Sequence, residues 1–161
     1  MNKAYLLTGG NLGDREQYLA TARSLINELC GTIVTASSLY ETAAWGKTDQ
    51  PSFLNQALEL DTALNAKQLI RRILKVEKMM GRTRDEKYGP RLIDIDMLLF
   101  NNEKHNYGFL KIPHPEMHKR AFVLVPMMEL DPEFEHPTLH TAMDMLYMDC
   151  DDQSDVVMLD A

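Results

Sequence analysis

The stretch Ile93-Asp94-Ile95-Asp96-Met97-Leu98-Leu99-Phe100 has the clearest strand pattern in this sequence of 161 residues. Because the side chains of a strand point alternately to opposite faces, Asp94 and Asp96 are expected to share one face. The other face is then expected to carry the apolar residues Ile93, Ile95, Met97 and Leu99. The segment therefore predicts a strand that buries one face and presents two carboxylates on the other.

Strand and helix patterns precede this segment in a regular order. The expected elements are a strand over 3–8, a helix capped by Asn11 or Asp14 and ended by Gly31, strands over 32–40 and 53–62, and a helix that Asn65 caps. The order is then β-α-β-β-α-β. Two βαβ-like halves of this kind form an antiparallel sheet with both helices on one face, which is the ferredoxin-like arrangement.

Further elements are expected after the last of these strands. They are a short strand over 109–112, a helix over 122–130, a weaker helix over about 138–148 and an acidic tail. With 45% hydrophobic and 25% charged residues, the chain has the composition of a globular protein. We therefore expect one α+β domain over 1–161, with a ferredoxin-like βαββαβ sheet and additional C-terminal elements.

Charge and hydropathy limit the partners of this domain. The formal net charge is −7, whereas a protein that neutralises many phosphates of a nucleic acid is normally basic. No apolar run approaches the roughly 20 residues that cross a bilayer, and the first residues lack the apolar stretch of a signal peptide. We expect a cytoplasmic protein that binds neither nucleic acid nor membrane, with Cys30 and Cys150 as free thiols.

Asp94 and Asp96 also have a chemical interpretation. Two adjacent carboxylates repel each other unless a divalent cation lies between them, and hard oxygen ligands favour Mg²⁺. The alternative is a solvated face of an edge strand, which is the commoner meaning of an isolated Asp-x-Asp. Here, however, a basic segment with Arg82, Arg84 and Arg91 directly precedes the strand. Carboxylates that bind a cation, next to guanidinium groups that bind phosphate, favour phosphoryl transfer.

The basic segment over 81–92 is rich in glycine, proline and charge, and it is expected to be a loop. Each guanidinium offers a planar fork of donors to phosphate oxygens, although an arginine in a loop is often simply solvated. Like charges and few apolar anchors predict a loop that closes only over bound substrates.

Further along, His114 could donate a hydrogen bond to phosphate or exchange a proton, although a single histidine is more often structural.

Gly9-Gly10-Asn11-Leu12-Gly13 follows the first expected strand. It lacks the third glycine of a dinucleotide-binding loop and the lysine of a P-loop, so we expect a tight turn that brings backbone close to a ligand.

Two other classes of protein share parts of this combination of strand order and paired aspartates. A nucleotidyltransferase would need a basic surface for its template, and an RNA-binding module would need aromatic residues in an RNP-type pattern on its strands. The sequence contains neither feature.

Five motifs together resemble one known family, the 6-hydroxymethyl-7,8-dihydropterin pyrophosphokinases, over about residues 4–130. The motifs are Gly9-Gly10-Asn11-Leu12, Phe53-Leu54-Asn55, Gly81-Arg82-x-Arg84, Gly89-Pro90-Arg91-x-x-Asp94-Ile95-Asp96, and Pro113-His114 through Arg120-Ala121-Phe122. The resemblance implies that diphosphate passes from ATP to the hydroxymethyl group of a reduced pterin, with release of AMP, as a step of folate synthesis. It also implies a monomer whose partners are these two small substrates.

The resemblance assigns roles to particular residues. The implied metal ligands are Asp94 and Asp96, which would hold two Mg²⁺ ions and form the catalytic centre with Arg82 and Arg91. The implied ATP contacts are Glu77, Arg82, Arg84, Arg91, His114 and Arg120. The implied pterin contacts are Gly10, Thr42, Phe53, Asn55 and Phe122, and the two phenylalanines would sandwich the ring. Phe53 and Asn55 would share a strand face by the period of two, which places a stacking surface beside an amide.

Overall fold

The computed structural model describes residues 1–43, 50–81 and 92–159. The first part of the chain forms β1 (Asn2–Gly10), α1 (Arg15–Leu29), β2 (Thr32–Ala36), β3 (Tyr40–Thr42), β4 (Phe53–Thr62), α2 (Ala66–Met79) and β5 (Asp94–Phe100). The remainder forms β6 (His105–Tyr107), β7 (Leu110–Ile112), a 3₁₀ turn η1 (Met117–Lys119), α3 (Ala121–Leu130), α4 (Met143–Met148) and β8 (Val157–Met158). The expected order of elements is confirmed from β1 to β5, except that the strand expected over 32–40 is divided into β2 and β3. After β5, the strands β6 and β8 are additional to the expected elements, and the helix expected over about 138–148 covers only Met143–Met148.

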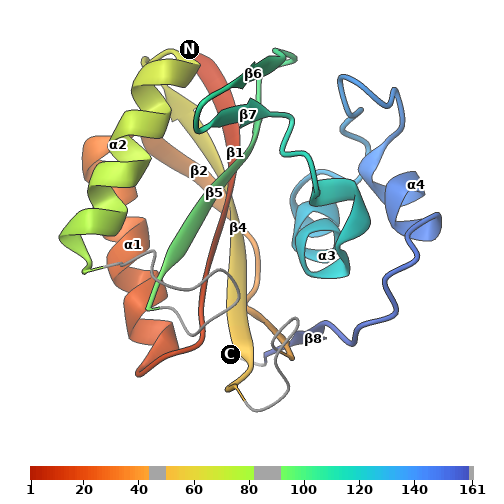
Figure 1. Ribbon diagram of the computed structural model, residues 1–161, viewed down its shortest axis with the longest axis horizontal. Coiled ribbons are helices and arrows are strands. Elements are labelled where there is room, and N and C mark those ends of the chain that lie inside the picture. Colours follow the sequence, from red (N-terminus) through yellow and green to blue (C-terminus); the bar gives the residue numbers. More distant parts are fainter. Residues whose placement is uncertain (44–49, 82–91, 160–161) are drawn as a thin grey trace.

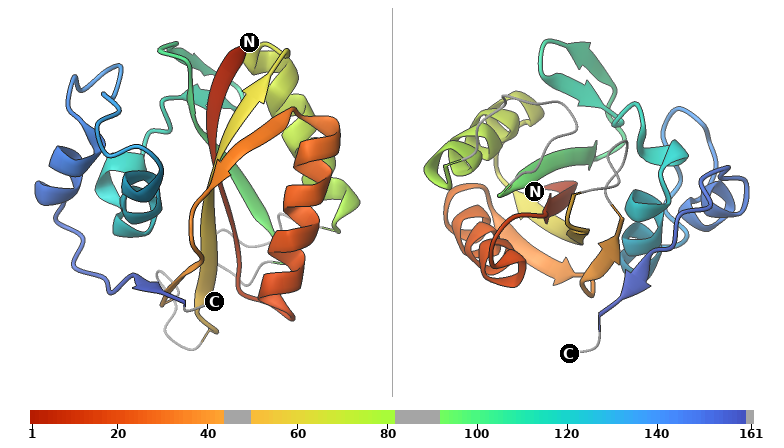
Figure 2. Two further views of the ribbon diagram at one scale, coloured as in Figure 1. Left: turned by 180° about the vertical axis from the view of Figure 1, so that it is seen from behind. Right: turned by 60° about the horizontal axis from the view of Figure 1, so that its bottom comes forward.

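The large sheet has the strand order β5-β1-β4-β3-β8, and β2 also pairs with β4. Every pairing in it is antiparallel. Helices α1 and α2 cover one face of the sheet, and α3 and α4 lie on the opposite side (Figure 1). The view from behind shows the same three layers (Figure 2). The ferredoxin-like arrangement is thus confirmed, and the additional C-terminal elements form its third layer.

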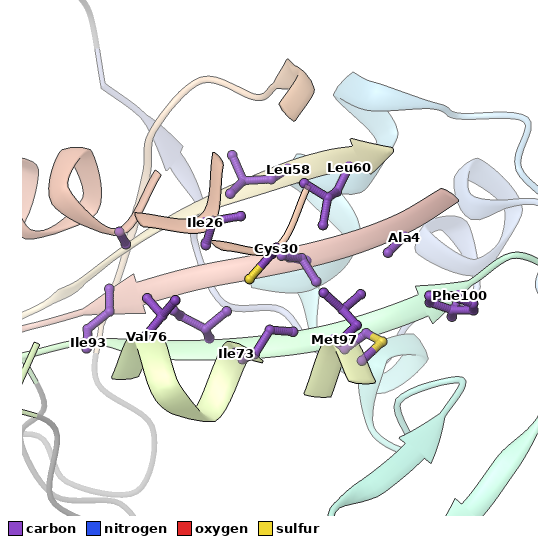
Figure 3. Close-up of a cluster of buried hydrophobic side chains, with 14 of the residues drawn as sticks. Ala4, Ile26, Cys30, Leu58, Leu60, Ile73, Val76, Ile93, Met97 and Phe100 are labelled. Carbon is purple, nitrogen blue, oxygen red and sulfur yellow. The ribbon is translucent and has the colours of Figure 1, made fainter. Parts of the chain in front are cut away.

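The main core lies between the sheet and the helices α1 and α2. Figure 3 shows its side chains, which include Ala4, Ile26, Cys30, Leu58, Leu60, Ile73, Val76, Ile93, Met97 and Phe100. These positions recur at helical spacing in α1 and α2, and they alternate along the strands, as the period of each element requires. Burial of this face is what fixes the two helices on the same side of the sheet.

A second core lies on the other side of the sheet, under α3 and α4. It contains Tyr5, Leu7, Ala57, Leu98, Leu99, Leu124, Met127 and Met143. The expected position of Leu99 is therefore wrong, because Leu99 faces this second core and not the first. The pairing register shifts between Tyr5 and Leu6, which pair with Leu99 and Met97. Leu98 is the extra residue of a bulge, and such an insertion reverses the alternation beyond it.

The ends of α1 and α2 confirm two expected caps. The side chain of Asp14 accepts a hydrogen bond from Gln17 N at 3.1 Å. Asn65 and Gln68 form a capping box, in which each side chain accepts from the other's backbone. A cap of this kind contributes about 1 kcal/mol to helix stability. Among the described helices, none combines the length and the apolar character needed to cross a membrane.

Candidate active site

Asp94 and Asp96 lie on β5, the outermost strand on one side of the sheet. They pair with Gly9 and Leu7 of β1 and are both half-buried. Their neighbours Ile93, Ile95 and Met97 are in the first core, so the two carboxylates share the opposite face, as the alternation predicted.

The carboxylate of Glu77 holds the strand between these two aspartates. Glu77 lies on α2 and is only 2% exposed. Its Oε2 accepts a hydrogen bond from the backbone N–H of Ile95 at 2.8 Å. A buried carboxylate that accepts from backbone stiffens the segment it binds. The contact places Glu77 under the carboxylate pair, and its expected role as an ATP contact stays a prediction.

Replacing Glu77 with alanine is expected to lower the free energy of unfolding by about 1–3 kcal/mol, because the buried Ile95 N–H loses its acceptor. Urea unfolding measures this loss. The matched control is Lys78→Ala at the next, exposed position, which should change stability little. Equal stability of the two variants would show that Glu77 does not support β5.

Hydrogen bonds at its backbone and at its imidazole ring hold His114 in place. Its N–H donates to Leu98 O at 2.9 Å, and its Nδ1 accepts from Glu116 N at 3.1 Å. Since Nδ1 is an acceptor, the neutral ring carries its proton on Nε2. Burial lowers the pKa of His114, and the nearby Arg120 charge lowers it further, against the carboxylates Glu116 and Asp94. His114 is therefore a neutral donor near pH 7.

A cavity of about 170 Å³ opens beside Asp96 and His114. Its walls come from α2, β5 and the β6–β7 hairpin, and they are Ile70, Leu74, Ile95, Met97, Phe109, Leu110, Lys111, Ile112 and Pro115. Most of the side chains around the cavity are apolar, and Asp96, His114 and Lys111 add polar groups to its lining. Sequence reasoning missed these residues, because they lie in segments far apart along the chain and form no motif.

A second group of expected site residues meets where β1, β4 and β3 pair. Gly9 and Gly10 pair with Asn55 and Leu54, and Thr42 pairs with Phe53. The Asn55 amide Nδ2 donates to Thr8 O at 3.3 Å. A Cβ at Gly9 would collide with this amide, so Gly9 is needed at that position. The pairing register therefore brings the expected Gly10, Thr42, Phe53 and Asn55 together.

Two polar atoms of this group are buried without a partner. Within the described chain, neither Thr42 Oγ1 nor Asn55 Oδ1 has a hydrogen-bond partner. A buried polar atom without a partner costs about 1–3 kcal/mol, so native proteins keep few of them. Both atoms lie at one corner of the sheet, where a ligand with a polar edge would satisfy them.

The start of α3 supplies two further expected residues. Arg120 and Phe122 flank Ala121, the first residue of the helix. The Arg120 Cζ lies 5.8 Å from the centre of the Phe122 ring, which is a cation–π distance. Phe122 packs against the second core, and the charge of Arg120 acts on His114. The start of α3 thus carries one residue that is expected to contact ATP, Arg120, and one that is expected to contact the pterin, Phe122.

The remaining expected residues, Arg82, Arg84 and Arg91, lie outside the described residues, as does the loop closure expected there. Among the described residues, no group of three or more side chains forms a metal cluster. Asp94 and Asp96 nevertheless fit Mg²⁺, which commonly takes one or two carboxylates and completes its shell with water and substrate phosphates.

The protein has the ferredoxin-like α+β fold, with two carboxylates on one face of an edge strand of its sheet. Residues 5–132 match the family model of 7,8-dihydro-6-hydroxymethylpterin-pyrophosphokinase (HPPK). The chain belongs to this family and has its pyrophosphokinase role in folate biosynthesis.

Individual relatives agree with this membership. The chain is 44% identical to the 2-amino-4-hydroxy-6-hydroxymethyldihydropteridine pyrophosphokinase of Bacillus subtilis, over 83% of this chain and 81% of that protein. It is 42% identical to the enzyme of the same name from Aquifex aeolicus, over 85% of each. A crystal structure of wild-type Plasmodium falciparum HPPK-DHPS, with pterin and p-hydroxybenzoate, matches 92% of this chain at a TM-score of 0.73 and 19% identity. The present chain covers 41% of that longer chain, and this likeness supports the fold alone.

Proposed function

We propose that this chain transfers diphosphate from ATP to the hydroxymethyl group of 6-hydroxymethyl-7,8-dihydropterin and releases AMP. Family membership supports the reaction. The observation that carries the assignment of substrates to sites is the pair of buried atoms, Thr42 Oγ1 and Asn55 Oδ1, that have no hydrogen-bond partner among the described residues. Asn55 pairs with Gly9 of β1, and Gly9 pairs in turn with Asp94 on the other side, so one strand separates these atoms from the carboxylates. The polar edge of a pterin offers donors and acceptors that match a hydroxyl and an amide oxygen.

The cavity between α2, β5 and β7 is the proposed site of the adenine. Its apolar walls, which include Ile70 and Leu74, suit a flat aromatic base. Asp96 and His114, which also line the cavity, would then contact the triphosphate. His114 would donate its Nε2–H to a phosphate oxygen without adding a titrating charge near neutral pH.

Asp94 and Asp96 are the proposed ligands of two Mg²⁺ ions. Bound Mg²⁺ neutralises phosphate charge and lowers the barrier to attack on phosphorus. The aspartates hold this charge at the edge of the sheet, and Arg120 adds a positive group from the start of α3. We propose that Arg91, Arg82 and Arg84 bind the phosphates as well, and that the last two act late, when both substrates are bound.

The pterin would lie between Phe53 and Phe122, with Gly10, Thr42 and Asn55 at its edge. This orientation directs the hydroxymethyl oxygen toward the β-phosphorus of ATP. A new bond forms between that oxygen and the β-phosphorus, and the bond to the oxygen bridging the α- and β-phosphorus breaks. AMP leaves with the bridging oxygen, and the hydroxyl proton is released. The proposed reaction needs residues of one chain only, so a monomer would suffice, and we place it in the cytoplasm, where ATP is available.

The purified protein is expected to form AMP from ATP only when both the pterin and Mg²⁺ are present. Chelation of Mg²⁺ by excess EDTA should stop the reaction, because without the cation the two carboxylates repel the negatively charged phosphates. Chromatographic separation of AMP, ADP and ATP measures the products. AMP formation that is unaffected by EDTA would contradict the metal assignment, and ADP in place of AMP would contradict the proposed reaction.

A further inference from the structure

The chain after α4 runs past α3 to the edge of the sheet, where β8 pairs with β3 (Figures 1 and 2). We refer to residues 149–159 as the C-terminal strap. The family match ends at residue 132, before this segment. Within the strap, Asp152 Oδ2 accepts a hydrogen bond from the backbone N–H of Ala121 at 2.9 Å, across 31 positions of sequence.

The N-terminus of α3 needs such an acceptor. The first N–H groups of a helix have no partner within the helix, and a preceding side chain usually supplies one. In α3 that preceding residue is Arg120, whose side chain makes no cap hydrogen bond. Asp152 therefore caps the helix from a distant part of the chain, and its negative charge suits the positive end of the helix dipole.

Asp152 is itself held in place by the rest of the strap. Ser154 N donates to Asp152 Oδ1 at 2.9 Å. Farther along, Val157 and Met158 pair with Glu41 and Tyr40 of β3. Leu159 N also donates to Leu39 O at 2.9 Å. The strap is thus hydrogen-bonded both to α3 and to the β3 edge of the sheet.

The apolar side chains of the strap join both cores. Cys150 packs against the second core, and Leu159 packs against the first.

Burial raises the pKa of Asp152, but hydrogen bonds from Ser154 and Ala121 outweigh this effect and hold the pKa below its usual range. The carboxyl is therefore ionised at neutral pH and remains an acceptor.

We propose that Asp152 is a positioning residue for both substrates. By capping Ala121 it fixes the start of α3, and with it the Arg120 and Phe122 side chains on either side. The inference rests on the proposed roles of Arg120 toward ATP and of Phe122 toward the pterin. It assigns to the strap a task in the active site, beyond closing the sheet edge at β3.

Replacing Asp152 with alanine tests this role. The KM for both substrates is expected to rise roughly threefold to tenfold, as loss of one helix cap frees the start of α3, with a smaller change in kcat. Asp152→Asn should restore KM to within about twofold, because the amide oxygen still accepts the Ala121 N–H. Asp151→Ala, at the exposed neighbouring position, is the matched control and should behave as wild type.

Two further measurements keep the proposal open to contradiction. If Asp152→Ala does not fold, Asp152→Glu retains the charge but shifts the carboxylate by one methylene, and its KM values should still exceed those of Asp152→Asn. The backbone amide resonances of Ala121 and Phe122 should move in Asp152→Ala and Asp152→Glu but not in Asp151→Ala, whether or not catalysis is measured. Wild-type KM values and unchanged resonances in these Asp152 variants would overturn the inference. Absence of pterin-dependent AMP formation by the wild-type protein would instead contradict the proposed function.

Discussion

Asp94→Asn or Asp96→Asn is expected to lower kcat by about a thousandfold or more, because a metal ion supplies several kcal/mol of transition-state stabilisation and each 1.36 kcal/mol changes the rate tenfold. Asparagine keeps the shape of the side chain but loses the charge that attracts the cation. The fold should survive, since both positions are half-buried and removal of one of two adjacent negative charges relieves repulsion.

AMP release at ordinary and raised Mg²⁺ concentrations measures the effect, and thermal unfolding followed by circular dichroism checks the fold. Asp61→Asn is the control, since Asp61 lies on β4 and pairs with Lys3 and Thr32, far along the strand from the site. It removes one negative charge and should retain activity. Near wild-type turnover in either Asp94→Asn or Asp96→Asn would show that the metal assignment is wrong.

Phe53→Ala and Phe122→Ala are each expected to weaken pterin binding by roughly tenfold to a hundredfold, since stacking on an aromatic side chain contributes about 1–3 kcal/mol per ring. Affinity for a non-hydrolysable ATP analogue should change much less, because the proposed adenine cavity is lined by other residues. Titration calorimetry with each ligand separately gives both affinities.

A third aromatic residue separates stacking from packing. Phe134 packs against the second core and lies edge-on to Tyr5 at 5.3 Å between ring centres. Phe134→Ala should lower stability, yet it should leave pterin affinity near the wild-type value. Equal losses of pterin and ATP affinity in the Phe53 and Phe122 variants would indicate a general packing role for these rings.

The order of elements could be predicted from sequence because each element has its own period. The alternation around Asp94 and Asp96 and the helical spacing after Asn65 are both local patterns. The bulge at Leu98 was not predictable, because it is defined by the register of β5 against β1, and a register is a property of two strands. The strand β8 was missed for the same reason, as it is short and exposed and is formed only by pairing with β3.

Some residues of the candidate site could likewise be predicted from the sequence, and others could not. Asp94 and Asp96 followed from the residues themselves, whereas Phe53 and Phe122 came from the resemblance to a family. The bond from Ile95 to Glu77 and the cap from Asp152 join segments that no motif connects. Such contacts depend on the folded arrangement, so only the structure could reveal them.

ATP labelled at its β-phosphorus tests the proposed diphosphate transfer directly, because the label follows the diphosphate itself. After a single turnover with 6-hydroxymethyl-7,8-dihydropterin and Mg²⁺, we expect the label to leave the nucleotide and to appear in the pterin product together with the γ-phosphate. The nucleotide that remains should be unlabelled AMP. A label that stays in ADP, with a single phosphate on the pterin, would instead show that the enzyme transfers one phosphate and not a diphosphate.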